Sequence, residues 1–151
     1  MKIALGTAQF GLNYGIVNKT GQIDSNLAKD IIDYARGIKI NTLDTAIAYG
    51  NSHKVLSKSD LSSFKVVSKL PSYNQDNNHP SYLEESFYKA LEDLQLESIY
   101  GFMFHSASDL FSNNGMSIFK SMIQLKEKKL IKKVGVSIYN PNDLGLSLIH
   151  I

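Results

Sequence analysis

Apolar segments alternate with amphipathic segments along most of the chain. Short apolar runs predict strands, whereas apolar residues repeated every three or four positions predict helices. The predicted strands cover residues 2–5, 42–45, 64–70, 99–104 and 134–138. This order is typical of parallel strands joined by crossover helices, so the predicted fold class is α/β.

The helices predicted between these strands each carry an apolar face. One helix runs from Ser25, its expected N-cap, to Gly37, where the glycine ends it. A short helix is predicted over residues 52–57, and a longer one begins at Ser81, which forms a capping-box pattern with Glu84. The apolar faces of the long helices consist of Leu27, Ala28, Ile31, Ile32 and Ala35; of Leu83, Phe87, Ala90, Leu91 and Leu94; and of Ile118, Phe119, Met122, Ile123 and Leu130.

The length of 151 residues fits one domain over residues 1–151. Five strands are too few to close an eight-stranded barrel, which takes about 250 residues. We therefore expect either a complete open sheet or the N-terminal part of a larger barrel. A further helix is predicted to begin at Pro141, but residues 146–151 lack a polar face, and we expect them to be non-native. The polar loop from Pro71 to Pro80 is long enough to reach over a site.

Composition and charge exclude several classes of protein. The chain is 43% hydrophobic and 20% charged, as in ordinary globular domains, and its net charge of +2 argues against a nucleic-acid or membrane partner. No apolar run approaches the roughly 18 residues of a membrane span, and the N-terminus does not follow the pattern of a signal peptide. The absence of cysteine excludes disulfides, thiolate catalysis and cysteine-bound metals. We therefore expect a cytoplasmic protein.

Polar side chains stand at or near the carboxyl ends of four predicted strands, where α/β folds place their sites. These residues are Asp44, Lys69, His105 and Ser137, and Tyr49 follows on the loop after the second strand. Each residue alone has a structural explanation, such as a turn, a solvated edge or core packing. At corresponding ends of successive parallel strands, however, they are expected to converge on one pocket.

Such a cluster has a coherent proton-transfer chemistry. A tyrosine has an ordinary pKa of about 10, which is too high for efficient proton transfer near neutrality. We expect the Lys69 ammonium to lower the pKa of Tyr49, Asp44 to hold the lysine in place, and His105 to relay or orient the proton. The result would be a general acid that protonates a carbonyl oxygen as hydride reaches the carbon, with no metal required.

The sequence resembles the aldo-keto reductases across essentially its whole length. The segment Leu5–Gly11 looks like the first strand and loop of that family, and Asn41–Ala46 with Tyr49–Ser52 is similar to its aspartate–tyrosine signature. Leu125–Ser137, with its basic helix end, looks like the fifth-strand motif. Several matches in the right order make the resemblance specific.

The resemblance implies an NADP(H)-dependent reductase of small carbonyl compounds on a (β/α)8 barrel, of which this chain is the N-terminal portion. It implies that Asp44, Tyr49, Lys69 and His105 form the catalytic tetrad, with Tyr49 as the proton donor. It also implies cofactor contacts from Gly6, Thr7, Asp44 and Ser137. Ile138 stands where the family commonly has asparagine, and Asn140 is the nearby amide that could replace that contact.

In this family the loops after the later strands hold the pyrophosphate and the 2′-phosphate, and these loops are not part of the sequence. We therefore expect the chain alone to be inactive, and the choice between NADPH and NADH stays open.

Two other functions remain open from the sequence. Lys69 could instead form a Schiff base in a barrel lyase or aldolase, which would not need Tyr49. The chain could also belong to a binding protein that senses nucleotide without turnover, although that function would not require all four tetrad side chains.

Overall fold

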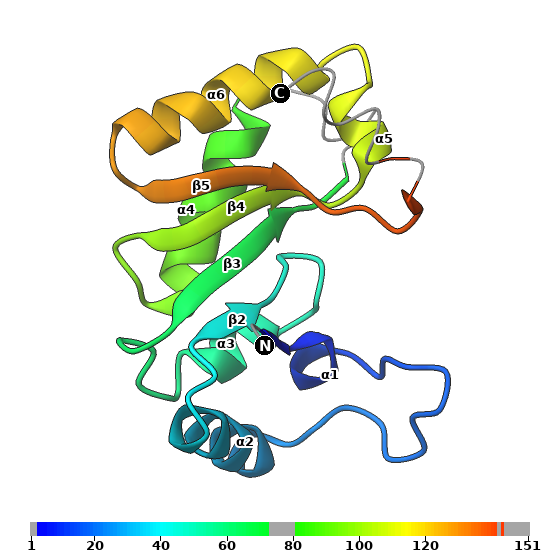
Figure 1. Ribbon diagram of the computed structural model, residues 1–151, viewed down its shortest axis with the longest axis vertical. Coiled ribbons are helices and arrows are strands. Elements are labelled where there is room, and N and C mark those ends of the chain that lie inside the picture. Colours follow the sequence, from blue (N-terminus) through cyan, green and yellow to red (C-terminus); the bar gives the residue numbers. More distant parts are fainter. Residues whose placement is uncertain (1–2, 73–80, 142, 144–151) are drawn as a thin grey trace.

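The computed structural model describes residues 3–72, 81–141 and 143. Its centre is a sheet of five parallel strands in the order β1-β2-β3-β4-β5 (Figure 1). The strands are β1 (Leu5–Gly6), β2 (Thr42–Asp44), β3 (Lys65–Leu70), β4 (Ile99–Phe104) and β5 (Ile131–Val136). Every strand pairs with its successor in the sequence, as the predicted α/β order requires.

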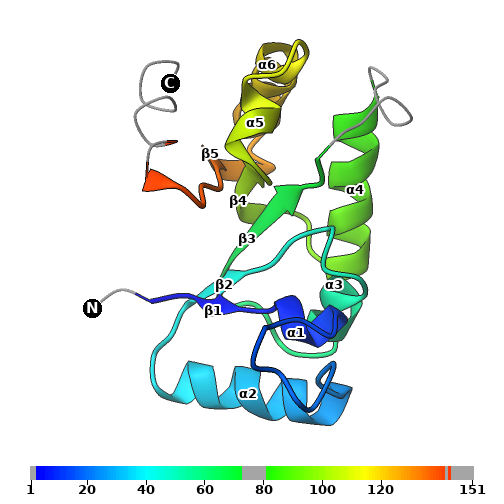
Figure 2. The same cartoon turned by 90° about the vertical axis from the view of Figure 1, so that its right-hand side faces the viewer.

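The connections between the strands are helical. They are α1 (Ala8–Gly11), α2 (Ser25–Gly37), α3 (Ser52–Leu56), α4 (Tyr82–Leu94), α5 (Ala107–Leu110) and α6 (Gly115–Glu127). The long helices lie along the convex side of the curved sheet (Figure 2). This placement sends the carboxyl ends of all five strands toward one edge of the molecule.

The hydrophobic core lies between the sheet and these helices. Alternate strand residues such as Leu43 and Phe102 are buried, and Ile32 and Phe87 bury the apolar faces of α2 and α4. The rings of Phe87 and Phe102 meet edge to face, with centroids 5.2 Å apart. The predicted apolar faces therefore point into the core, except that Leu27 is exposed at the edge of α2.

Several element boundaries agree with the sequence-based predictions, and two do not. The bounds of β4 are as predicted, and those of α2, β2, α3 and β3 agree within one residue. The first strand is Leu5–Gly6 rather than residues 2–5, and the fifth is Ile131–Val136 rather than residues 134–138. The fifth strand begins earlier because Ile131 is buried and pairs with Ile99, while the lysines that follow it remain exposed.

The predicted helix ends were less accurate. Asp24, not Ser25, is the N-cap of α2, and its carboxylate accepts from the backbone N–H groups of the second and third residues that follow. The Ser81 hydroxyl donates to Glu85 rather than forming the predicted capping box with Glu84.

Three further details of the helices differ from the sequence pattern. Leu130 is not on α6, because Lys129 takes a left-handed backbone conformation after the helix ends. The short helices α1 and α5 were not predicted. Residues 73–80 of the predicted loop, and residues 144–151 at the carboxyl end, lie outside the described part of the chain.

Candidate active site

The carboxyl ends of β2 and β3 bring a carboxylate and an ammonium group into direct contact. Lys69 is 3% exposed, and its Nζ lies 2.7 and 2.8 Å from the two carboxylate oxygens of Asp44. It also donates to the backbone oxygen of Thr45 at 3.0 Å. An ammonium group has three donors, and acceptor oxygens lie around it, as a buried charge requires. Lys69 is therefore a fixed cation in this site.

Tyr49 lies in the turn between β2 and α3, called here the Tyr49 turn (residues 46–52). Its hydroxyl is 3.4 Å from Lys69 Nζ, and the same Nζ lies 5.0 Å from the centre of its ring. The Tyr49 ring meets His105 at 88°, with ring centroids 6.0 Å apart. The structure thus brings together all four residues that the sequence pattern singled out as a tetrad.

The pKa of Tyr49 is shifted in the direction opposite to the one expected from the lysine alone. Burial, and next to it the Asp44 carboxylate, raise the pKa of Tyr49 above its usual value. The physical reason is that burial disfavours the phenolate, while the carboxylate in contact with Lys69 offsets the positive charge at the phenol. Tyr49 is therefore a protonated phenol near neutral pH, which suits a proton donor.

His105 follows β4 and is held as a neutral ring. Burial and the positive charge of Lys69 lower the pKa of His105. Its Nδ1 atom is buried and has no hydrogen-bond partner within the described part of the chain. Because a buried N–H without an acceptor is costly, we assign the ring proton to Nε2. His105 can then donate a hydrogen bond from Nε2 to a ligand.

Two candidate cofactor residues lie at the end of β1. Gly6 pairs with Asp44, and no atom lies within 4 Å of where a Cβ on Gly6 would stand, so this position faces open space. The Thr7 side chain, in contrast, is completely buried, and its hydroxyl donates to the backbone oxygen of Asp44 at 3.1 Å. Thr7 therefore joins β1 to β2, and its hydroxyl is already used within the protein.

The remaining cofactor candidate, Ser137, follows β5 immediately. Its backbone N–H donates to the oxygen of Phe104 at 3.0 Å, so Ser137 lies beside the residue that precedes His105. The half-buried Ser137 therefore belongs to the same edge of the sheet as the tetrad. Ile138, at the position of the family's asparagine, is exposed.

Three residues that hold the Tyr49 turn were not recognised as functional from the sequence. Ser52 is buried, and its hydroxyl donates to the backbone oxygen of Thr7 at 3.0 Å. A Cβ on Gly11 would stand 1.7 Å from the backbone oxygen of Tyr49, so only glycine permits this approach. Gly50 has a left-handed φ of 55°, which also favours glycine. The available signal was that Gly11 ends the motif Leu5–Gly11 and that Gly50 and Ser52 belong to the motif Tyr49–Ser52.

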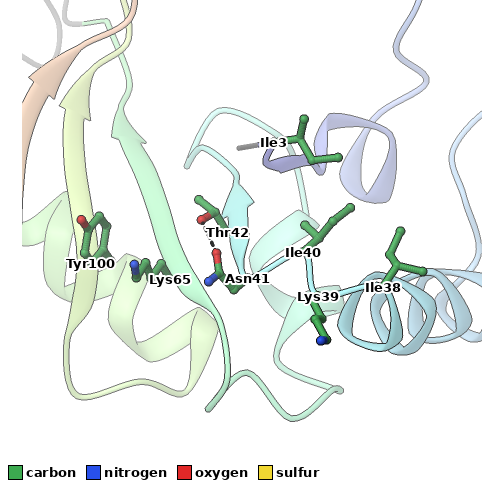
Figure 3. A pocket seen from close by; sticks show the side chains of 8 residues that line it. All are labelled: Ile3, Ile38, Lys39, Ile40, Asn41, Thr42, Lys65 and Tyr100. Atoms are coloured by element: carbon green, nitrogen blue, oxygen red, sulfur yellow. Dashed lines mark hydrogen bonds between the residues drawn. The ribbon is translucent and has the colours of Figure 1, made fainter. Parts of the chain in front are cut away.

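A separate cavity of about 490 Å³ lies at the opposite, amino ends of the strands (Figure 3). Its lining consists of Ile3, Ile38, Lys39, Ile40, Asn41, Thr42, Lys65 and Tyr100, and includes none of the predicted site residues. Lys65 Nζ lies 5.2 Å from the centre of the Tyr100 ring. The amino ends of barrel strands are ordinarily the stability face, so this cavity is not the candidate active site.

Two further searches covered only the described residues. No cluster of three or more His, Asp or Glu side chains within residues 3–72, 81–141 and 143 is arranged to hold a metal ion. No helix in this part of the chain is both long and apolar enough to cross a membrane.

Comparisons with known proteins agree on one family. The model of the aldo/keto reductase family matches residues 2–145. A solved structure assigned as an aldo-keto reductase from Pseudomonas aeruginosa has a TM-score of 0.78 and 26% identity, over 99% of this chain and 60% of the other. No curated protein matches the sequence.

Two more distant structures share the fold. An aldo-keto reductase from Bacillus halodurans, solved in its holo form, has a TM-score of 0.76 at 19% identity, over 98% of this chain and 49% of the other. An aldo-keto reductase from Bombyx mori, solved in complex with NADP, has a TM-score of 0.72 at 16% identity, over 99% of this chain and 50% of the other. The chain thus spans about half to three fifths of the length of these proteins, and its sheet is part of a (β/α)8 barrel.

Proposed function

This chain belongs to the aldo-keto reductase family, and on that premise we propose that it carries the proton-transfer residues of an NADP(H)-dependent reductase of small aldehydes or ketones. The observation that supports this most directly is the contact of Asp44, Lys69, Tyr49 and His105 at one edge of the sheet. The residues around this edge fit the nicotinamide end of the cofactor. Gly6 leaves open space there, and Ser137 offers a half-buried hydroxyl.

In the proposed reaction, the bound cofactor supplies a hydride to the carbonyl carbon. His105 donates a hydrogen bond from Nε2 to the carbonyl oxygen and orients it toward Tyr49. The Tyr49 hydroxyl then gives its proton to the oxygen as the alcohol forms, which leaves a phenolate. Lys69, 3.4 Å away, stabilises this phenolate, and Asp44 keeps Lys69 in position.

The raised pKa of Tyr49 favours one direction of this reaction. Reduction needs a protonated phenol, whereas oxidation of an alcohol needs a phenolate to accept its proton. With the pKa raised by burial and by Asp44, the phenolate is scarce near neutrality. We therefore propose that reduction is favoured at neutral pH and that oxidation gains as the pH rises.

The Schiff-base alternative is less well supported by the geometry. A Schiff base requires a neutral amine with a free lone pair. Lys69 is buried, and its Nζ donates to two carboxylate oxygens and a backbone oxygen, contacts that a free lone pair could not make. Borohydride trapping of a carbonyl compound on Lys69, detected by mass spectrometry, would support the lyase instead. A sensing role without turnover would leave the assembled tetrad unexplained.

The decisive experiment is Tyr49→Phe in the enzyme as its gene encodes it. We expect NADPH-dependent aldehyde reduction to fall by about 10²–10⁴-fold, because the positioned general acid is lost. NADPH affinity, measured by fluorescence titration, should stay nearly unchanged because the hydroxyl acts on the substrate. Tyr34→Phe removes an equivalent hydroxyl from an exposed position on α2 and serves as the control. Turnover by Tyr49→Phe equal to that of Tyr34→Phe would remove Tyr49 from the mechanism.

A further inference from the structure

The loop between α1 and α2 is exposed but held in one shape. This rim loop (residues 12–22) lies beside α1, on the side toward which the strands point (Figure 1). The Asn18 side chain organises it from within. Its Nδ2 donates to Tyr14 O and Gly21 O, both at 2.9 Å, and its Oδ1 accepts from the backbone N–H groups of Thr20 and Gly21 at 2.9 and 3.0 Å. Because the donors and the acceptor of this side-chain amide are all hydrogen-bonded to the loop backbone, the amide holds the loop in one conformation.

The rim loop is also attached to the Tyr49 turn. Gln22 Nε2 donates to the backbone oxygen of Phe10 at 2.9 Å and to Asn51 Oδ1 at 2.8 Å. At the other end of the loop, Leu12 packs close to Gly50. Tyr14 is near enough to contribute to the raised pKa of Tyr49. The loop therefore has a defined position relative to the phenol that would donate the proton.

A hollow of about 550 Å³ lies between this loop and α1. The Tyr14 ring and Val17 supply apolar surface, while the Gln9 amide and the Lys19 ammonium supply hydrogen-bond donors. No acidic residue lines the hollow, and Lys19 forms no ion pair with any residue that the structure describes. A cation without a counter-ion next to apolar surface fits an anionic group on an apolar stem.

We propose that this hollow binds the far end of the carbonyl substrate and favours substrates that carry an anionic group there. The inference rests on the proposed reductase function, and it deepens it by naming a substrate class. Lys19 pairs with the anion, Gln9 donates a hydrogen bond to it, and the Tyr14 ring packs against the stem. Asn18 is a positioning residue, because it holds Tyr14 and Lys19 on a loop that would otherwise be free to move.

The test compares acids with their methyl esters, which lack the negative charge and carry one more methyl group at the far end. The substrates are 4-carboxybenzaldehyde and 4-formylcinnamic acid, two lengths of stem, and their esters. In the enzyme as its gene encodes it, we expect Lys19→Met to raise KM for at least one acid roughly threefold to fivefold, as for an exposed ion pair. The kcat values and the ester kinetics should not change.

A matched control and a second variant make the result specific. Lys120→Met removes the same charge from an exposed position on α6 and should leave both acids and esters unaffected. Asn18→Ala should weaken the preference for the acid without changing the pH profile of kcat. Equal acid-to-ester ratios in Lys19→Met and the wild type would overturn the subsite alone. Failure of the wild type to reduce all four compounds would overturn the proposed function and the subsite with it.

Discussion

Replacing Gly11 by alanine is the sharpest test of how the Tyr49 turn is held. The added Cβ would lie 1.7 Å from the backbone oxygen of Tyr49 and 2.5 Å from the backbone nitrogen of Ser52. Both are backbone atoms, so no side-chain rotation relieves the contact. The two segments must separate by roughly 2 Å to reach an ordinary distance. This movement would displace Tyr49 relative to Lys69, to which its hydroxyl is only loosely bonded at 3.4 Å.

The magnitude follows from two contributions. Overpacking a well-packed region typically costs 1–3 kcal/mol. The Tyr49 oxygen also accepts a hydrogen bond from Ser52 N–H at 3.0 Å, and losing it costs about 1 kcal/mol more. We therefore expect Gly11→Ala to lower the free energy of unfolding by about 3 kcal/mol and to reduce kcat at least about tenfold, because the general acid is displaced.

Urea unfolding and steady-state kinetics of the enzyme measure both effects. Gly37→Ala is the matched control, because Gly37 ends α2 with an ordinary φ and no atom lies within 4 Å of its would-be Cβ. That variant should be as stable as the wild type or slightly more stable. If Gly11→Ala unfolds at the same urea concentration as Gly37→Ala, the close approach of α1 to the Tyr49 turn does not exist as described.

Three further predictions concern the tetrad, a buried histidine and the chain by itself. Lys69→Met should lower turnover near neutrality and raise the pKa of Tyr49 further, since the neighbouring cation is lost; a pH–rate profile that does not move would contradict this. Burial lowers the pKa of His53 to about 4, so unfolding exposes a group that takes up a proton near pH 6.5. Stability should be full above that pH and fall by up to about 3 kcal/mol as the pH drops toward 4, and His53→Gln should flatten this dependence in urea titrations at several pH values. Residues 1–151 alone should associate, because β1 and β5 are the edge strands of the sheet within the described residues, and should bind NADPH poorly, because the loops expected to hold its phosphates are not in these residues. A monomer in analytical ultracentrifugation with a cooperative melt would refute this.

The periodicity of the sequence was sufficient to identify the fold class and most of the elements. The continuous apolar run at Ile99–Phe104 gave a strand with the observed bounds, and the helical spacing over residues 25–37 gave a helix that agrees within one residue at each end. Helix caps were harder to predict from the sequence than the helices themselves, because several polar residues near a helix start can each act as N-cap. The actual caps were Asp24 at α2 and the Ser106–Asp109 capping box at α5, which the sequence pattern did not single out. Strand β5 begins earlier in the chain than predicted because its hydrogen-bonded pairing with β4 starts at Ile131. The local sequence pattern does not show where that pairing starts.

The residues of the candidate site were also accessible from the sequence, because parallel strands place their carboxyl ends at one edge. Asp44, Lys69 and His105 follow this rule, and the structure brings them together with Tyr49. Their roles stay proposals, but their proximity follows from the order of strands along the chain. Topology thus made the grouping predictable without any knowledge of side-chain contacts.

The electrostatic state of the site was decided only by the tertiary structure. The sequence places a lysine near a tyrosine and so suggests a lowered pKa, yet burial and the Asp44 carboxylate raise the pKa of Tyr49 instead. Desolvation and charge compensation depend on distances of a few ångströms between segments far apart in the chain. The same holds for the approach of Gly11 to Tyr49 and for the hollow beside Lys19. Local sequence determines which side chains are available, and only packing determines how far each one lies from its neighbours and from water.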